Sequence, residues 1–334
     1  MLAPKFWYPE NNEKSFSSLA LIPFGHIYSL LSKLRMSKAV KKQFDIPIVC
    51  IGNLNAGGTG KTPTTISAAE FLRDRKYNVH IVSRGYGGNA MGPLSVNDTE
   101  HSADDVGDEA LMLSAFAPTW VATKRSDGIQ SAIKEGADII LLDDGFQDPS
   151  VYKDLSILTV NAKKGFGNNR CIPAGPLREK LSNGLERADV LISIGTETSQ
   201  ITFKSIYKSY INMPLGIANL EVLNTGLSLE NMKVLAFAGI AHPENFFDTL
   251  RAQGAEIVDY QALADHQKLS STIMKRLIVD ARAENAQLIT TEKDYMRLPK
   301  EFRSEVMTLP VRIKLNETLS WEKIFKPILS CQGK

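Results

Sequence analysis

The sequence has few cysteines and no marked excess of one charge. Its three cysteines are odd in number and far apart in 334 residues, so they form neither a disulfide framework nor a paired-cysteine metal site: Cys50, Cys171 and Cys331. We therefore expect a reducing compartment. Its 39 basic and 37 acidic residues give a net charge of +2, which is too balanced for a protein whose main partner is nucleic acid.

The composition is that of an ordinary globular protein. Hydrophobic residues make up 43% and charged residues 23%, which excludes a collagen, a coiled coil, a largely disordered chain and a polytopic membrane protein. At about 150 residues per domain, the length predicts two domains.

The N-terminal 44 residues combine apolar and basic residues. Seven Lys or Arg and two Glu give this segment a net charge of +5, and the rest of the chain has −3. The apolar stretch 19–34 is too short and too interrupted to span a bilayer, and the basic cluster follows it, unlike a signal peptide. A helix lying in a membrane interface fits this pattern. A helix packed on the protein's own core fits equally well, because periodicity does not distinguish the two.

Continuous apolar runs follow from residue 45 onward and alternate with helical patterns. Such runs are typical of strands buried on both faces of a parallel sheet that helices cover. The expected strands are 46–53, 78–84, 119–123, 137–144, 155–161 and 188–195, with a helix at 61–76.

A second α/β pattern follows a change of character at 201–223. There TFKSIYKSYIN alternates apolar and polar residues, which predicts a half-exposed antiparallel ribbon. Strands are then expected at 233–240, 256–260 and 287–291, and helices at 243–254 and 271–285. We expect an α/β protein in four parts: a membrane-interface helix at 1–44, a nucleotide-binding domain with a parallel sheet at 45–200, a β-ribbon linker at 201–225 and a smaller α/β domain at 226–334.

A glycine-rich loop follows the first expected strand and opens the first helix. NAGGTGKT matches the G-x-x-x-x-G-K-[ST] phosphate loop except at its first position, which is Asn55. Its glycines allow backbone N–H groups to point at phosphate oxygens, and the helix dipole adds to the attraction. The expected phosphate-binding residues are Asn55, Ala56, Gly57, Gly58, Thr59, Gly60, Lys61 and Thr62.

Two carboxylates end the apolar strand ILLDDGFQ. In such nucleotide-binding proteins an acid at this place lies near Mg²⁺, and the hydroxyl that follows the loop lysine also binds the metal. We therefore expect Thr62, Asp143 and Asp144 at a metal site, although either aspartate alone would also suit a turn before Gly145. Loop and strand together predict nucleotide binding.

Two other nucleotide-binding classes fit less well. Membrane-associated ATPases with a deviant loop have a lysine where this chain has Ala56. A GTPase base-recognition motif needs lysine where Thr291-Glu292-Lys293-Asp294 has glutamate, and this string instead predicts a helix start.

Seven motifs, taken in order, resemble the tetraacyldisaccharide 4′-kinases, the family of lipid A 4′-kinases. They extend the resemblance from the N-terminal apolar segment to about residue 298. The Thr-Pro after the loop lysine and the string PAGPLRE are not general features of phosphate-loop proteins. The motifs are GNLNAGGTGKTP (52–63), VSRGYGG (82–88), GDEALML (107–113), DDGFQ (143–147), PAGPLREK (173–180), DHQ (265–267) and TTEKD (290–294).

The resemblance implies a reaction and a place in the cell. The γ-phosphate of ATP would pass to the 4′-hydroxyl of an acylated glucosamine disaccharide 1-phosphate, with Mg²⁺, at the cytoplasmic face of the inner membrane. The implied partners are this lipid and a membrane surface; no obligatory protein partner is evident. The alternative is a membrane-associated ATPase switch or an assembly factor.

The resemblance also assigns roles to residues. Asp108 matches the catalytic acid and His266 its partner from the second domain, with Lys61 also catalytic; by itself, Asp108 would be a helix cap and His266 a cap or surface group. The family has histidine where this chain has Asp148 and Gln267. Residues expected at substrate or phosphate are Arg84, Tyr86, Glu109, Gln147, Arg178 and Glu179.

Overall fold

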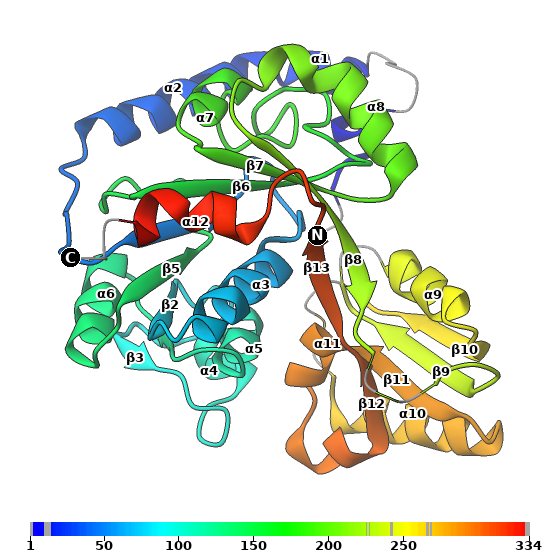
Figure 1. Cartoon of the computed structure of the whole chain (residues 1–334). Coiled ribbons are helices and arrows are strands. Elements are labelled where there is room, and N and C mark those ends of the chain that lie inside the picture. Colours follow the sequence, from blue (N-terminus) through cyan, green and yellow to red (C-terminus); the bar gives the residue numbers. More distant parts are fainter. Residues whose placement is uncertain are drawn as a thin grey trace.

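The computed structural model describes residues 3–9, 15–224, 226, 228–240, 243–264, 267 and 269–330. Its strands form one nine-stranded and one four-stranded sheet (Figure 1). The large sheet has the order β13-β8-β7-β6-β1-β5-β2-β4-β3, and the small sheet β10-β9-β11-β12.

The centre of the large sheet is parallel, as the continuous apolar runs predict. Every residue of β1, β2, β5 and β7 is buried. The parallel strands are β7 (Val190–Ile194), β6 (Leu155–Asn161), β1 (Ile48–Gly52), β5 (Ile139–Asp143), β2 (Val79–Ser83) and β4 (Thr119–Val121). The edge strand β3 (Leu94–Ser95) is antiparallel to β4.

Helices cover both faces of this sheet. One core includes Ile66, Leu113 and Phe325, from α3 (Lys61–Asp74), α5 (Asp108–Ser114) and α12 (Trp321–Leu329). The core on the other face includes Ile129, Leu185 and Phe203, from α6 (Arg125–Lys134), α7 (Leu181–Glu186) and α8 (Glu197–Tyr207). The short helix α4 (Ala103–Val106) precedes α5.

The smaller sheet is parallel throughout and also lies between helices. It contains β10 (Glu256–Ala262), β9 (Lys233–Ala238), β11 (Gln287–Thr291) and β12 (Val306–Leu309). Alternate residues of β9 face α9 (Pro243–Ala252) and α10 (Ser271–Ala283) in separate cores. The strands and helices expected in this region are confirmed; α11 (Glu292–Met296) and the 3-10 helix η4 (Lys300–Glu305) follow β11.

The prediction of a ribbon strand at 201–211 is wrong. This segment is the end of α8 and the 3-10 helix η3 (Lys208–Tyr210). Phe203 and Tyr207 lie four residues apart, so a helix places both on one face, where their rings contact Phe166. A ribbon does connect the two parts of the chain, but it pairs β8 (Leu215–Val222) antiparallel to β13 (Val311–Leu315).

The C-terminal segment differs from the expected division at 226–334. After β12 the chain returns through β13 to the large sheet, and α12 packs there. The reason is the apolar face of α12, where Trp321 and Phe325 are buried against Phe71 of α3.

Helices α1 (Phe16–Ala20) and α2 (Ile22–Lys38) lie along the outer side of the large domain (Figure 1). The 3-10 helix η1 (Lys5–Trp7) precedes them. Trp7 Nε1 donates to Pro173 O over 3.0 Å, and Ser18 Oγ to Ala174 O over 2.7 Å. Most large apolar side chains of α1 and α2 are exposed. Within the described ranges, no helix is long and apolar enough to cross a bilayer.

Candidate active site

The phosphate loop lies where β1 ends, at the carboxyl edge of the large sheet. Asn53 holds its curve: Nδ2 donates to Gly57 O over 3.2 Å and to Thr59 Oγ1 over 2.9 Å. Gly57 and Gly60 have φ values of +108° and +88°, which glycine adopts without strain. α3 then begins at Lys61, as the motif predicts.

The loop leaves open space over its middle glycines. A Cβ built at Gly57 or Gly58 would meet nothing within 4 Å, whereas at Gly60 it would lie 2.4 Å from Ile194 Cδ1. A larger residue in place of Gly57 or Gly58 would therefore protrude into this space. The backbone N–H of Ala56 faces elsewhere and donates to Pro176 O over 2.7 Å. This cradle is suited to phosphate oxygens.

Cations from two elements face Asp144, which follows β5. Lys61 Nζ lies 3.8 Å from its Oδ1, and Arg178 Nη1 donates to both carboxylate oxygens over 3.0 and 3.1 Å. Buried Asp143 accepts a bond from Thr65 Oγ1 over 3.3 Å. Thr62 is half-buried in the first turn of α3. The two expected acids are therefore next to the loop.

The two aspartates have opposite pKa shifts. Burial, together with the carboxylates of Glu109 and Asp144, raises the pKa of Asp143 to about 7. Burial also acts to raise the pKa of Asp144, but the cations of Lys61 and Arg178 outweigh it and hold that pKa below its ordinary value. A cation near Asp143 would restore its charge.

The donor set fits Mg²⁺. This ion uses one or two carboxylates together with phosphate oxygens and water, and needs no complete protein cage. In the described part of the chain, no three His, Cys, Asp or Glu side chains form a ready cluster for a metal. Asp143 and Asp144, beside the open phosphate cradle, supply the one or two carboxylates that Mg²⁺ needs.

Three predicted residues form one polar network beside the loop. Gln147 Nε2 donates to Asn53 O over 2.9 Å and to Glu179 Oε1 over 3.2 Å, and Arg178 Nη1 donates to Gln147 Oε1 over 3.3 Å. Arg187 Nη2 donates to both oxygens of Glu179 over 2.6 Å. Buried Glu179 therefore supports the loop through Gln147.

Asp108 begins α5 and is buried. Its Oδ1 accepts the N–H of Glu109 over 2.9 Å. The N-cap of α5 is Gly107 and Asp108 is the first helical residue, so the expectation that Asp108 caps the helix is wrong. Its Oδ2 lies 3.7 Å from Nζ of Lys293, which is on α11 of the smaller domain, and 3.7 Å from Nε of Arg297, which directly follows that helix. Lys293 Nζ also lies 3.4 Å from Glu109 Oε1. His266 lies outside the described residues.

The loop after β2 reaches the turn that precedes Asp108. A Cβ at Gly107 would lie 2.5 Å from Tyr86 O, so the two segments approach closely. The side chains of Arg84 and Tyr86 are exposed here. They lie at the edge of the sheet where ligands of α/β proteins bind.

Sequence reasoning missed Arg125, Lys293 and Arg297. Arg125 is buried, pairs with Asp148 over 3.0 Å and donates to Asp144 O over 2.8 Å, so Asp148 supports the strand end in place of the expected histidine. Nothing in the sequence around Arg125 pointed to this contact. Lys293 lies within the TTEKD motif, where the sequence predicted only a helix start; Thr291 does cap α11.

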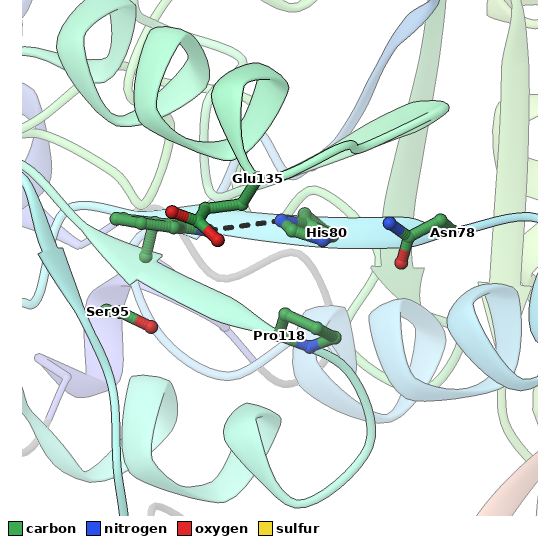
Figure 2. A pocket seen from close by; sticks show the side chains of 6 residues that line it. Asn78, His80, Ser95, Pro118 and Glu135 are labelled. Atoms are coloured by element: carbon green, nitrogen blue, oxygen red, sulfur yellow. Dashed lines mark hydrogen bonds between the residues drawn. The ribbon is translucent and has the colours of Figure 1, made fainter.

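A pocket of about 490 Å³ lies elsewhere, near the amino ends of β2 and β4 (Figure 2). In it, Trp120 Nε1 donates to His80 Nδ1 over 3.2 Å, and burial lowers the pKa of His80. No predicted site residue lines this pocket, whose lining is Asn78, His80, Ser95, Pro118, Trp120 and Glu135.

Comparisons with known proteins agree on one family. The family model described as tetraacyldisaccharide-1-P 4′-kinase matches residues 17–329. Tetraacyldisaccharide 4′-kinases of Jannaschia sp. and Dinoroseobacter shibae are 49% and 46% identical, over 95% and 94% of this chain and 96% and 94% of theirs. The LpxK structure from Aquifex aeolicus, in complex with ATP, has a TM-score of 0.76 at 25% identity and covers 95% of this chain and 99% of its own.

Proposed function

This chain belongs to the tetraacyldisaccharide-1-P 4′-kinase family, and from this premise we propose that its phosphate cradle and Asp108 form the active site. The chain is an ATP-dependent lipid A 4′-kinase with a phosphate-loop α/β fold. It transfers the γ-phosphate of ATP to the 4′-hydroxyl of tetraacyldisaccharide 1-phosphate. The observation that carries the site is the glycine cradle, with Lys61 and the two aspartates directly beside it.

ATP binds with its phosphates in the cradle of residues 55–62. The N–H groups around Gly57 and Gly58 donate hydrogen bonds to phosphate oxygens, and Lys61 turns from Asp144 toward the β- and γ-phosphates. Arg178 holds Asp144 and offers a second cation at the same place.

Asp143, Asp144 and the hydroxyl of Thr62 would hold Mg²⁺. When bound, this ion neutralises negative charge on the phosphate oxygens. Asp143 must lose its proton to bind a cation, and its raised pKa means that it does so near neutral pH.

Asp108 orients the acceptor hydroxyl and takes its proton late in the transfer. The bond between the γ-phosphorus and the bridging oxygen of ATP breaks, while the sugar oxygen forms the new bond to phosphorus. In such a loose transition state, positioning matters more than strong early deprotonation. His266, from the smaller domain, relays or orients for Asp108. Glu109, Gln147, Glu179, Arg84 and Tyr86 complete the surroundings of substrate or phosphate.

The N-terminal helices meet the acyl chains of the lipid at the membrane. Phe16, Phe24, Ile27, Leu30 and Leu31 are between 57% and 85% exposed, so they contribute little to the protein's own core. Five exposed basic residues follow or accompany them: Lys33, Arg35, Lys38, Lys41 and Lys42. Exposed apolar residues beside basic ones favour an interfacial helix on the cytoplasmic leaflet, without a membrane span.

The proposed roles of Asp108 and His266 are tested by single and double substitution. Asp108→Ala and His266→Ala should each lower turnover by roughly 10²–10⁴. If the two residues act as a unit, the double variant should be little worse than either single variant. Asp98→Ala, at an exposed aspartate, is the control.

Measuring lipid phosphorylation together with ATP hydrolysis distinguishes the kinase from the alternative functions. An ATPase switch or an assembly factor would hydrolyse ATP slowly without phosphorylating lipid. Lipid phosphorylation by Asp108→Ala at the wild-type rate would show that Asp108 has no catalytic role and is only an acidic residue in the first turn of α5.

A further inference from the structure

We propose that Lys293 and Arg297 of the smaller domain position Asp108, so that the active site is complete only when α11 lies against α5. The inference rests on the role proposed above for Asp108. It concerns the same site and adds two residues that act through Asp108.

Both cations face one oxygen of the Asp108 carboxylate. Lys293 Nζ and Arg297 Nε each lie 3.7 Å from Oδ2, while Oδ1 accepts the N–H of Glu109. The side chains of Asp108 and Arg297 are 6% and 7% exposed, and that of Lys293 is 23% exposed. Water therefore screens this group of charges little, and the carboxylate is fixed from both sides.

Arg297 is held firmly by its own domain. Its Nη2 donates to Gly239 O over 2.9 Å and to Asp294 Oδ1, and Asp294 is fully buried. Asp294 in turn accepts the N–H of Gly239 over 3.0 Å and the hydroxyl of Thr291 over 2.7 Å. These hydrogen bonds within the smaller domain fix the orientation of the Arg297 guanidinium, which faces the large domain.

One donor of Arg297, the Nε–H group, faces the Asp108 carboxylate of the large domain. Its buried Nε makes no hydrogen bond within the described residues. Asp108 Oδ2, at 3.7 Å, is about 0.8 Å beyond the usual hydrogen-bond length. A small further approach of the domains would complete this bond, so the geometry favours the closed arrangement.

Arg297 also contacts the segment that carries the proposed partner of Asp108. Its Nη1 donates to Gln267 O over 3.4 Å, and Gln267 follows His266 in sequence. One guanidinium thus faces both Asp108 and Gln267. A displacement of Arg297 would change its contacts with the Asp108 carboxylate and with the Gln267 carbonyl together.

An ordinary contact between domains is the competing explanation. α11 also packs through Met296 on the core that contains Val106 and Ala110, and this contact needs no catalytic role. A stabilising contact would change the unfolding midpoint, whereas a positioning residue changes kcat and leaves ATP binding intact.

The test replaces Lys293, because its side chain is partly exposed. Its replacement leaves the hydrogen bonds of Arg297 to Gly239 and Asp294 in place. Lys293→Met should lower kcat for lipid phosphorylation roughly 10- to 100-fold, with the KM for ATP within twofold and the unfolding midpoint unchanged. Lys293→Arg, which keeps the charge, should recover most of the activity. Lys275→Met, at an exposed lysine of α10, is the matched control and should resemble the wild type.

A double-substitution cycle separates this inference from the proposed function. In an Asp108→Asn background, Lys293→Met should have no further effect, because its action passes through the carboxylate. Wild-type kcat in Lys293→Met beside an inactive Asp108→Asn would overturn the inference and leave the proposed function standing. Full activity of Asp108→Asn would overturn both. If Lys293→Met lowers both the unfolding midpoint and kcat, and Lys293→Arg does not restore kcat, then Lys293 is only a structural contact, which would also overturn the inference.

Discussion

Replacing Leu30 and Leu31 of α2 by glutamine should weaken binding to membranes without unfolding the protein. The two side chains are 59% and 60% exposed, so most of their apolar surface is available to a bilayer. Full burial of a leucine side chain contributes about 1.5–3 kcal/mol, so the exposed part of each contributes about 1.5 kcal/mol. Together the two substitutions should cost about 3 kcal/mol, a roughly 100-fold loss of partitioning.

The assay is co-sedimentation with vesicles that contain anionic phospholipid, at low and high salt. Glutamine leaves the basic residues from Lys33 to Lys42 in place, so the salt dependence should remain while the affinity falls. Val279→Gln is the matched control, because Val279 of α10 is 63% exposed on the smaller domain. Turnover on bilayer-embedded lipid should fall more than turnover on detergent-dispersed lipid.

Two results would refute the membrane proposal. One is unchanged sedimentation of the double variant. The other is an equal loss of vesicle binding in Val279→Gln. That result would mean that any exposed apolar side chain contributes to membrane binding and that α2 is not the membrane-binding helix.

Three further predictions concern the nucleotide site and the domains. Lys61→Ala should lower turnover by several orders of magnitude with the fold intact, and near-normal lipid phosphorylation would contradict its role. The pKa of Asp143 is raised to about 7, so the folded protein keeps a proton that the unfolded chain releases above its ordinary pKa of 3.8. Without nucleotide, wild type should therefore lose stability relative to Asp143→Asn as pH rises from about 4 to 7, by up to roughly 1.4 kcal/mol per pH unit; a constant difference in unfolding free energy would count against it. X-ray scattering with and without nucleotide should show a changed angle between the domains about the β8–β13 ribbon, and identical profiles in every liganded state would dismiss this motion.

The sequence predicts the buried strands and the phosphate loop because both are local patterns. The apolar runs around Val49 and Leu141 require burial on both faces, and Gly60-Lys61-Thr62 requires a strand before it and a helix after it. The structure has both. The pattern at 201–211 misled because Phe203 and Tyr207 satisfy an alternating and a helical spacing at once.

The remaining contacts depend on how distant segments meet. α12 returns to the large sheet because its apolar face fits beside Phe71, which lies about 250 residues earlier. Lys293 reaches Asp108 only because β8 and β13 place the smaller domain against α5. Arg125 supports Asp144 through backbone carbonyls, which leave no trace in residue spacing.

Transfer of label from γ-labelled ATP to the lipid is the decisive measurement of the kinase activity. Purified protein is incubated with Mg²⁺ and detergent-dispersed tetraacyldisaccharide 1-phosphate, with Lys61→Ala as the matched inactive variant. We expect label in the lipid with the wild type only, and none when Mg²⁺ is chelated. Label that appears solely as free phosphate, at a rate that the lipid does not change, would contradict it.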